Sequence, residues 1–299
     1  MKKIIMMVGA MLLTIGFTAC GSDDDDNNNA VTENQGGTGG NQDGTSTEIP
    51  SPYLTDTNGN KIQVASIGGL QFTYNENGKL TGIISDYYGK YEMGETFTLT
   101  NYRSGSSYTR KTESAFTTND KGLIVKSEYK YGRVVDSNWD VRETETRNYN
   151  YNSENQLTSI TYTRTYIEES ESGTRTGTVS FNWVDGNLSS IIDTSTDSYT
   201  QNTGEQKVEN DKDTYTFEYG NQVNVFKQVP AIVCEAAIDI NDIEMLGVLG
   251  LIGVGPTYLP TNCTHTDKDG RQYTIPPLTY ELNENGSIKK EGYTEYQYK

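Results

Sequence analysis

The sequence predicts an all-β protein: an antiparallel up-and-down meander forming a water-soluble barrel or a strongly curved sheet. The chain has 22 tyrosines among 299 residues and many threonines, and these residue types suit a pleated, half-buried surface. Apolar stretches with the period of a helix are nearly absent, and a hairpin-like motif recurs along most of the chain. Together these observations indicate strands joined by short turns.

The recurring motif consists of alternating aromatic or aliphatic residues, a polar turn, and a Leu or Ile two positions later. Its clearest copies are residues 72–83, 148–160, 179–191 and 278–290, with looser copies at 115–127 and 215–225. Asn and Gly supply the positive φ that a hairpin turn requires. We therefore expect short turns at one end of the meander, centred near Gly78, Gly122, Asn155, Gly186, Asn221 and Gly286.

Connections at the other end look longer and more polar. They comprise residues 86–95, 133–140, 168–177 and 195–213. Long loops on a rigid scaffold are where binding residues concentrate. The loops at this end are therefore the first place to look for a ligand site.

Three copies of the motif carry Leu-x-x-Ile after the turn, as in Leu157 and Ile160. Residues three apart in a flat strand point to opposite faces. Either a bulge follows each turn, or both faces of the sheet are partly covered.

Charged residues argue against strands that face lipid. In the strand predicted at 143–151, Glu143, Glu145 and Arg147 alternate with Arg142, so both faces carry charge. A charge near the bilayer midplane costs roughly 2–4 kcal/mol. The sheet is therefore expected to face water.

The N-terminus resembles that of a bacterial lipoprotein. Lys2 and Lys3 precede an apolar run of 14 residues, Ile4 to Phe17, which is shorter than the roughly 20 residues that cross a bilayer. GFTAC resembles a lipobox, so residues 1–19 are predicted to be a lipoprotein signal peptide and Cys20 the lipidated residue. Acyl chains on Cys20 would hold the protein on a membrane.

Residues 20–52 are predicted to be an acidic, flexible tether, and residues 53–299 a single β-barrel-like domain. Four aspartates and three asparagines follow Gly21 and Ser22, and Gly, Asn and Thr dominate the stretch after them. Such a composition cannot bury a core. Contiguous aspartates also lack the alternate spacing and central Gly of a calcium loop.

A family resemblance agrees with this division. YNENGKL at 74–80, YNSENQL at 151–157 and LGVLGLIGVGPTYLP at 246–260 resemble a Bacteroidetes surface lipoprotein family of unknown function that has a porin-like fold. The resemblance implies a lipid-anchored protein of the outer membrane that faces the exterior. It carries over no catalytic residue.

The formal charge of the chain indicates which partners it is not expected to bind. Removing Lys2 and Lys3 with the signal peptide leaves 22 of the 24 basic residues against 41 acidic ones, a formal charge of −19. Nucleic acid is therefore not an expected partner.

Cys234 and Cys263 form a candidate disulfide in an exported protein, with two free buried thiols as the alternative.

Residues 243–254, IEMLGVLGLIGV, form the most apolar run of the mature chain. We expect a short helix or loop inserted in the barrel, although Gly247, Gly250 and Gly253 disfavour a helix. The run would plug one end of the barrel, because exposed apolar patches of this size are uncommon. The alternative is a gate over a small apolar ligand.

Signals of catalysis are weak. His265 is the only histidine, and no Gly-x-Ser-x-Gly elbow, phosphate loop or dinucleotide fingerprint accompanies it. We therefore predict no enzymatic activity, no catalytic residue, no cofactor and no metal site. His265 is expected to be structural or exposed, beside a turn at Asp269 and Gly270.

Binding is the function that the sequence favours. Tyr87, Tyr88, Tyr91 and Trp139 lie in the predicted long loops, where aromatic rings often form binding hot spots. We predict a surface-tethered binding or adhesion module for a glycan or a protein. A carrier of a small apolar ligand gated by residues 243–254, and a structural subunit of a cell-surface assembly, are the alternatives.

Overall fold

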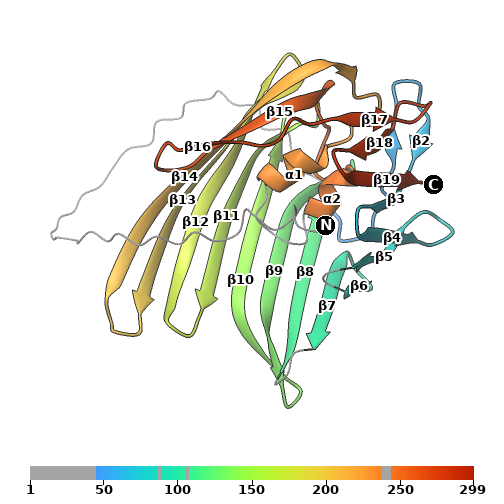
Figure 1. Ribbon diagram of the computed structural model, residues 1–299. Helices are drawn as coiled ribbons and strands as arrows, with labels where there is room; N and C mark the ends of the chain where they lie inside the picture. The colour runs from blue at the N-terminus through green and yellow to red at the C-terminus, as the bar shows by residue number, and fades with distance from the viewer. Residues whose placement is uncertain (1–44, 87–88, 105–107, 238–243) are drawn as a thin grey trace, which may run out of the picture.

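The computed structural model describes residues 45–86, 89–104, 108–237 and 244–299. Strands β3 to β19 follow one another as an antiparallel meander in which spatial order matches chain order, while β1 and β2 form a separate pair (Figure 1). The predicted all-β meander is thus confirmed.

The elements have the following bounds. The strands are β1 (Leu54–Thr55), β2 (Lys61–Ile62), β3 (Val64–Ile67), β4 (Leu70–Tyr74), β5 (Leu80–Ser85), β6 (Gly89–Met93), β7 (Thr98–Ser104), β8 (Thr109–Thr118), β9 (Ile124–Val135), β10 (Asn138–Tyr151), β11 (Leu157–Ile167), β12 (Glu171–Val184), β13 (Asn187–Gln201), β14 (Gln206–Val223), β15 (Tyr258–Thr266), β16 (Gln272–Thr274), β17 (Tyr280–Leu282), β18 (Ile288–Glu291) and β19 (Thr294–Tyr298). The helices are α1 (Ala231–Ala237) and α2 (Glu244–Val248).

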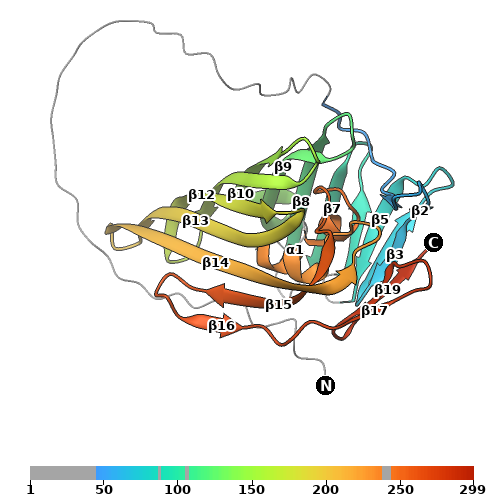
Figure 2. The ribbon, with the colours of Figure 1, turned by 90° about the horizontal axis from the view of Figure 1, so that it is seen from above.

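The sheet is strongly curved and wraps around the two helices (Figures 1 and 2). Its ladder is interrupted between β16, which pairs with β15, and β17, which pairs with β18. Strands β8 to β14 have 10 to 18 residues, whereas β16 to β19 and β3 to β6 have 3 to 6. The long strands therefore extend well beyond the helices, as Figure 1 shows.

The two ends of the meander differ. We call the end with the helices and the turns at Gly78, Gly122 and Asn155 the plugged end, and the end with the β9–β10, β11–β12 and β13–β14 turns the far end. At the plugged end, the Oδ1 atom of Asn152 accepts the backbone N–H groups of Glu154 and Gln156, and Asn155 has a positive φ. Asx hydrogen bonds of this kind define the turns that the sequence predicts.

Two predicted loop features are wrong. Asn221 lies inside β14 and is not a turn centre. At the far end, Asp136 and Ser137 form a two-residue turn with positive φ at both positions, so β9 and β10 continue through most of the segment predicted as a long loop. Residues 168–177 and 195–213 are likewise mostly strand, because polar residues here continue the ladder.

Leu-x-x-Ile is explained by bulges. The register shifts after Tyr151 pairs with Leu157, after Trp183 pairs with Leu188, and after Tyr74 pairs with Leu80. One extra residue after each turn brings the Leu and the Ile onto the same buried face. The bulge is therefore the correct choice between the two predictions.

The aromatic residue before each turn ties neighbouring hairpins together. Tyr151 donates its hydroxyl to the Ile124 carbonyl at 2.6 Å, and Tyr219 donates to the Leu188 carbonyl at 2.8 Å. Trp183 makes the equivalent bond from Nε1 to the Leu157 carbonyl. These bonds join the end of one strand to the start of the neighbouring strand, so the aromatic residue of the motif links one hairpin to the next.

The apolar insertion fills the plugged end. Leu246, Leu249, Leu251 and Ile252 are all buried and belong to the same core cluster as the strand aromatics. Residue 243 lies outside the described residues, and α2 supplies the predicted short helix. No helix among the described residues is long and apolar enough to cross a membrane.

Glu291 fixes the first helix from within this core. Its carboxylate accepts the backbone N–H groups of Ala231 and Ile232 at 3.0 and 3.1 Å, and the hydroxyl of Tyr296 at 2.6 Å. Burial raises the pKa of the Glu291 carboxyl, while these hydrogen bonds act in the opposite direction. The N–H groups at the start of α1 are thus satisfied by a side chain of β18, about 60 residues further along the chain.

Candidate functional site

The candidate site is the inner face of the long strands beyond the helices, which is polar rather than apolar. Alternate residues of β10 to β14 point inward, and at the far end most of them are Glu, Asp, Arg and Tyr. These inward residues include Glu143, Glu145, Arg147, Tyr162, Arg164, Tyr166, Arg175, Asp193, Asp197, Tyr199, Glu209, Asp211 and Asp213. We call this set the inner polar face.

Two tyrosines of β11 cross glycines of β12 to reach aspartates of β13. The Tyr162 hydroxyl donates to Asp193 at 3.2 Å, and the Tyr166 hydroxyl donates to Asp197 at 3.0 Å. A Cβ on Gly177 would lie 2.4 Å from Cζ of Tyr162. Glycine in the strand interior is required for this close approach.

Tyr199 adds a third bond of the same kind, donating to Glu209 on β14 at 2.7 Å. Burial raises the pKa of Asp193 and of Asp197, and the tyrosine hydrogen bonds act against this shift. For Tyr199, burial and the neighbouring Glu209 raise the pKa to about 12. These hydroxyls therefore stay protonated and act as donors to the carboxylates at neutral pH.

Arginines balance part of this negative charge. Arg175 donates from Nε to the Ser195 hydroxyl at 3.1 Å and lies 3.9 Å from the Asp211 carboxylate. Arg164 pairs with Glu143 at 3.0 Å. Burial raises the pKa of Glu143, and the Arg164 charge lowers it in part.

Deeper inside the curved sheet, Glu145 and Arg147 form a buried ion pair. The Arg147 guanidinium also lies over the Tyr162 ring, 5.4 Å from its centroid. This pair is thus the buried part of the inner polar face, next to the core.

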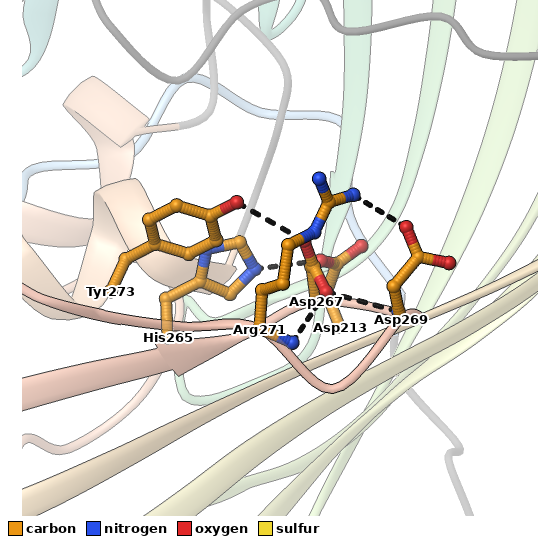
Figure 3. Close-up of polar contacts among 6 residues, drawn as sticks. All are labelled: Asp213, His265, Asp267, Asp269, Arg271 and Tyr273. Atoms are coloured by element: carbon orange, nitrogen blue, oxygen red, sulfur yellow. Dashed lines mark hydrogen bonds and ion pairs between the residues drawn. The ribbon is translucent and has the colours of Figure 1, made fainter.

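His265 forms a second cluster next to β14 (Figure 3). Its Nε2 atom lies 2.6 Å from Oδ1 of Asp213. Its ring stacks between Tyr215, with centroids 4.5 Å apart, and Tyr273, with centroids 5.7 Å apart. The three rings come from neighbouring strands β14, β15 and β16, where Tyr215 and Tyr273 each pair with His265.

The β15–β16 turn braces this cluster. Arg271 pairs with Asp267 at 2.9 Å and also with Asp269, and Tyr273 donates its hydroxyl to Asp267 at 3.3 Å. Gly270 has a positive φ, so the predicted turn at Asp269 and Gly270 is confirmed. Tyr273 remains 49 % exposed, so its ring can be reached by a ligand.

Of the aromatic residues predicted to bind a ligand from long loops, Tyr91 and Trp139 lie in strands. Tyr87 and Tyr88 lie outside the described residues. Tyr91 is buried in β6, and Trp139 lies in β10, so the loop position predicted for both is wrong. The ligand role of Trp139 stays a prediction.

The Trp139 side chain packs on the outer face of the sheet, on the side opposite the inner polar face. The Lys111 ammonium lies 3.7 Å from the centroid of its ring, and a Cβ on Gly132 would come within 2.9 Å of its Nε1. Glycine again makes room for an aromatic ring, as Gly177 does for Tyr162. This arrangement was not predicted, because residues 133–140 were expected to form a loop.

No disulfide joins Cys234 to Cys263, and both side chains are buried. The candidate disulfide is therefore not formed, and the alternative of two buried residues holds. Burial raises the pKa of the Cys263 thiol to about 12, so this side chain packs as an apolar residue. Cys20 lies outside the described residues, and its lipidation stays a prediction.

Metal-ligand clusters are not found among the described residues: no group of three or more His, Cys, Asp or Glu side chains is arranged to hold a metal ion. The residues of the candidate site that were not predicted from the sequence are Arg175, Asp193, Asp197 and Asp213. One signal pointed to them. Gly173 and Gly177 stand four apart inside one strand, as Tyr162 and Tyr166 do in the strand before it.

Comparisons with known proteins find similar chains among solved structures alone. No family model matches the chain, and no curated protein matches it by sequence. Among solved structures, a porin-like protein from Bacteroides vulgatus has a TM-score of 0.44 and 14 % identity, over 79 % of this chain and 98 % of that one. A porin-like protein from Bacteroides uniformis has a TM-score of 0.44 and 17 % identity, over 85 % of this chain and 99 % of that one.

Proposed function

We propose that the protein is a lipid-anchored, non-enzymatic binding module of the outer membrane surface, whose glycan or protein ligand contacts the inner polar face beside His265. Anchoring by Cys20 rests on the signal peptide and lipobox pattern. Binding rests on the exposure of charged and aromatic side chains on a concave sheet face.

Accessibility is the observation that carries the binding proposal. The side chains of Arg164, Arg175, Asp211 and Asp213 are 30–35 % exposed, although all four sit on the inner face. A sheet that served only to enclose a core would have apolar residues here. Charged groups held in place by neighbours, with water still able to reach them, are suited to hydrogen-bonding a ligand.

Tyr273 completes this surface with an exposed ring. Sugars and protein side chains both pack on such rings, and tyrosine is enriched in binding hot spots. Asp213 and His265 beside it offer polar groups that can orient the ligand. The combination supports a polar ligand that also has an apolar face.

The test is ligand screening with the full-length protein on a glycan array and against cell-envelope proteins. Tyr273→Ala should weaken binding of any ligand found by about 10-fold or more, as expected for loss of a hot spot. Tyr293→Ala is the matched control, since Tyr293 is 88 % exposed on the β18–β19 turn and should leave binding unchanged. Equal effects of the two variants would contradict the proposal.

Trp139→Ala extends the same assay to the outer face. A loss of binding with Trp139→Ala and none with Tyr273→Ala would move the site to the outside of the sheet. Steady hydrolysis of a polysaccharide by the purified protein would contradict the non-enzymatic part of the proposal.

The carrier alternative is less well supported. Leu246, Leu249 and Ile252 occupy the apolar interior at the plugged end, so an apolar ligand would have to displace them. A structural role in a cell-surface assembly is the other alternative. It predicts that purified protein self-associates or binds envelope proteins but binds no glycan.

Lipid attachment is tested separately. Cells fed a radioactive fatty acid should label the wild type and not Cys20→Ala. Label on both proteins would contradict attachment at Cys20.

A further inference from the structure

We infer that the plugged end of the barrel faces the bilayer and that the far end, with the inner polar face, points away from it. The inference rests on the proposed lipid attachment at Cys20. It adds an orientation, and with it a membrane-facing surface, to that proposal.

The first step is the place where the N-terminal segment joins the barrel. Ser46 and Thr118 exchange backbone hydrogen bonds at 2.8 Å in both directions, and Thr118 is the last residue of β8 at the plugged end. The Thr47 carbonyl accepts the Phe97 N–H at 2.7 Å, and the Pro50 carbonyl accepts the Leu80 N–H at 3.1 Å.

These contacts hold residues 46–50 against the sheet, although residues 20–52 were predicted to be a flexible tether. Leu80 begins β5, also at the plugged end, and Ile49 packs against the hydrophobic core. The chain between Cys20 and the barrel is therefore attached at the plugged end, whatever path it takes before residue 45.

The second step compares two lengths. Residues 21–44 number 24, and for a flexible chain of this length the root-mean-square span is about 27 Å. Strand β9 has 12 residues and spans about 40 Å at 3.3 Å per residue. The far end can therefore approach the bilayer only when the tether is stretched well beyond its average span.

The orientation has a consequence for binding. It holds the β9–β10, β11–β12 and β13–β14 turns and the inner polar face away from the lipid headgroups. A large ligand, such as a polysaccharide or a partner protein, could then reach the inner polar face without meeting the bilayer.

The test uses the two ends of β9. Asp120, in the turn before β9, and Ser137, in the turn after it, are both exposed. Each is replaced in turn by cysteine and labelled with a fluorescent donor in lipidated protein on vesicles that contain a lipid-soluble acceptor. Cys234 and Cys263 are buried and should not take the label in the folded protein.

We expect a larger loss of donor emission for D120C than for S137C. Equal loss, or a larger loss for S137C, would overturn the inferred orientation. A second variant, with residues 27–44 duplicated, lengthens the tether to 42 residues and its average span to about 36 Å, so the difference between the labels should shrink. An undiminished difference would show that something other than tether length sets the orientation.

Vesicle flotation separates the two proposals. Lipidated D120C and S137C should float with the vesicles, and Cys20→Ala should not. If the lipidated proteins fail to float, the anchor and with it the orientation are both wrong. If they float but the emission losses are equal or reversed, the orientation alone is wrong.

Discussion

The ring of Tyr162 lies close against Gly177, where an added Cβ would be 2.4 Å from Cζ and 2.5 Å from the hydroxyl oxygen. This contact lets Tyr162 pass over β12 and reach Asp193 on β13. Tyr166, Gly173 and Asp197 repeat the arrangement four residues along. Gly173 and Gly177 thus make room for the two tyrosines of the inner polar face, although neither glycine has a side chain that could contact a ligand.

Gly177→Ala should destabilise the protein by about 1–3 kcal/mol, the usual cost of overpacking. Gly173→Ala should cost more, because its new Cβ would meet the backbone oxygen of Ser198 at 2.8 Å and Cβ of Tyr199 at 2.6 Å, neither of which can rotate away. Urea unfolding measures both. Gly94→Ala is the control, since its nearest neighbour would be at an ordinary 3.4 Å, and equal effects at the three positions would contradict this account.

Asp193 should make stability depend on pH in a defined direction. Burial raises the pKa of Asp193 in the folded state, so the folded protein holds this proton more tightly than the unfolded chain. The stabilisation is complete below the unfolded pKa of about 4 and is lost as the pH rises through the folded pKa. Asp193→Asn cannot ionise, and Tyr162 can still donate to its amide oxygen.

The measurement is the free energy of unfolding of wild type and Asp193→Asn between about pH 3 and pH 7. As the pH rises from about 3 to about 7, the free energy of unfolding should fall less for the variant than for the wild type. Asp120→Asn, at an exposed turn position, should follow the wild type. A steeper loss in Asp193→Asn than in the wild type would contradict the sign of the shift.

The turns of the plugged end were predictable because their chemistry is local. Asn152 and Asn155 set the turn geometry within five residues, and the same residue types recur at each copy of the motif. The Leu and Ile residues that follow each turn belong to the same local motif, and they lie in the buried core. A bulge between the Leu and the Ile was one of two alternatives. The sequence alone could not decide between them, because it does not show which residues of the neighbouring strand pair with this segment.

The inner polar face was not predictable in the same way. In β10, Thr144 and Glu145 are both polar, so the sequence does not show which face is buried. Glu145 is buried because Arg147 and the barrel around it supply its partners. Polarity also made residues 133–140 resemble a loop, although Asp136 and Ser137 close a tight hairpin.

Glu291 should be among the most sensitive positions in the chain. Glu291→Ala leaves the N–H groups of Ala231 and Ile232 without their acceptor and opens a cavity, for an expected cost of about 2–5 kcal/mol. Tyr296→Phe, which removes a 2.6 Å bond, should cost more than Tyr280→Phe, which removes one of 3.5 Å. Thermal unfolding measures all three, and a Glu291→Ala protein as stable as the wild type would show that α1 does not depend on this cap.

Leu246 distinguishes a plug from a gate. Its side chain is fully buried in α2, so Leu246→Ala should cost about 2–5 kcal/mol if the insertion is part of the folded core. Val223→Ala is the surface control, because Val223 is 50 % exposed and such changes usually stay within about 0.5 kcal/mol. A gate held loosely over a ligand site would instead tolerate Leu246→Ala and admit an apolar fluorescent probe more readily than the wild type. Urea unfolding together with titration of that probe separates the two: lost stability without probe uptake supports the plug, and retained stability with probe uptake supports the carrier.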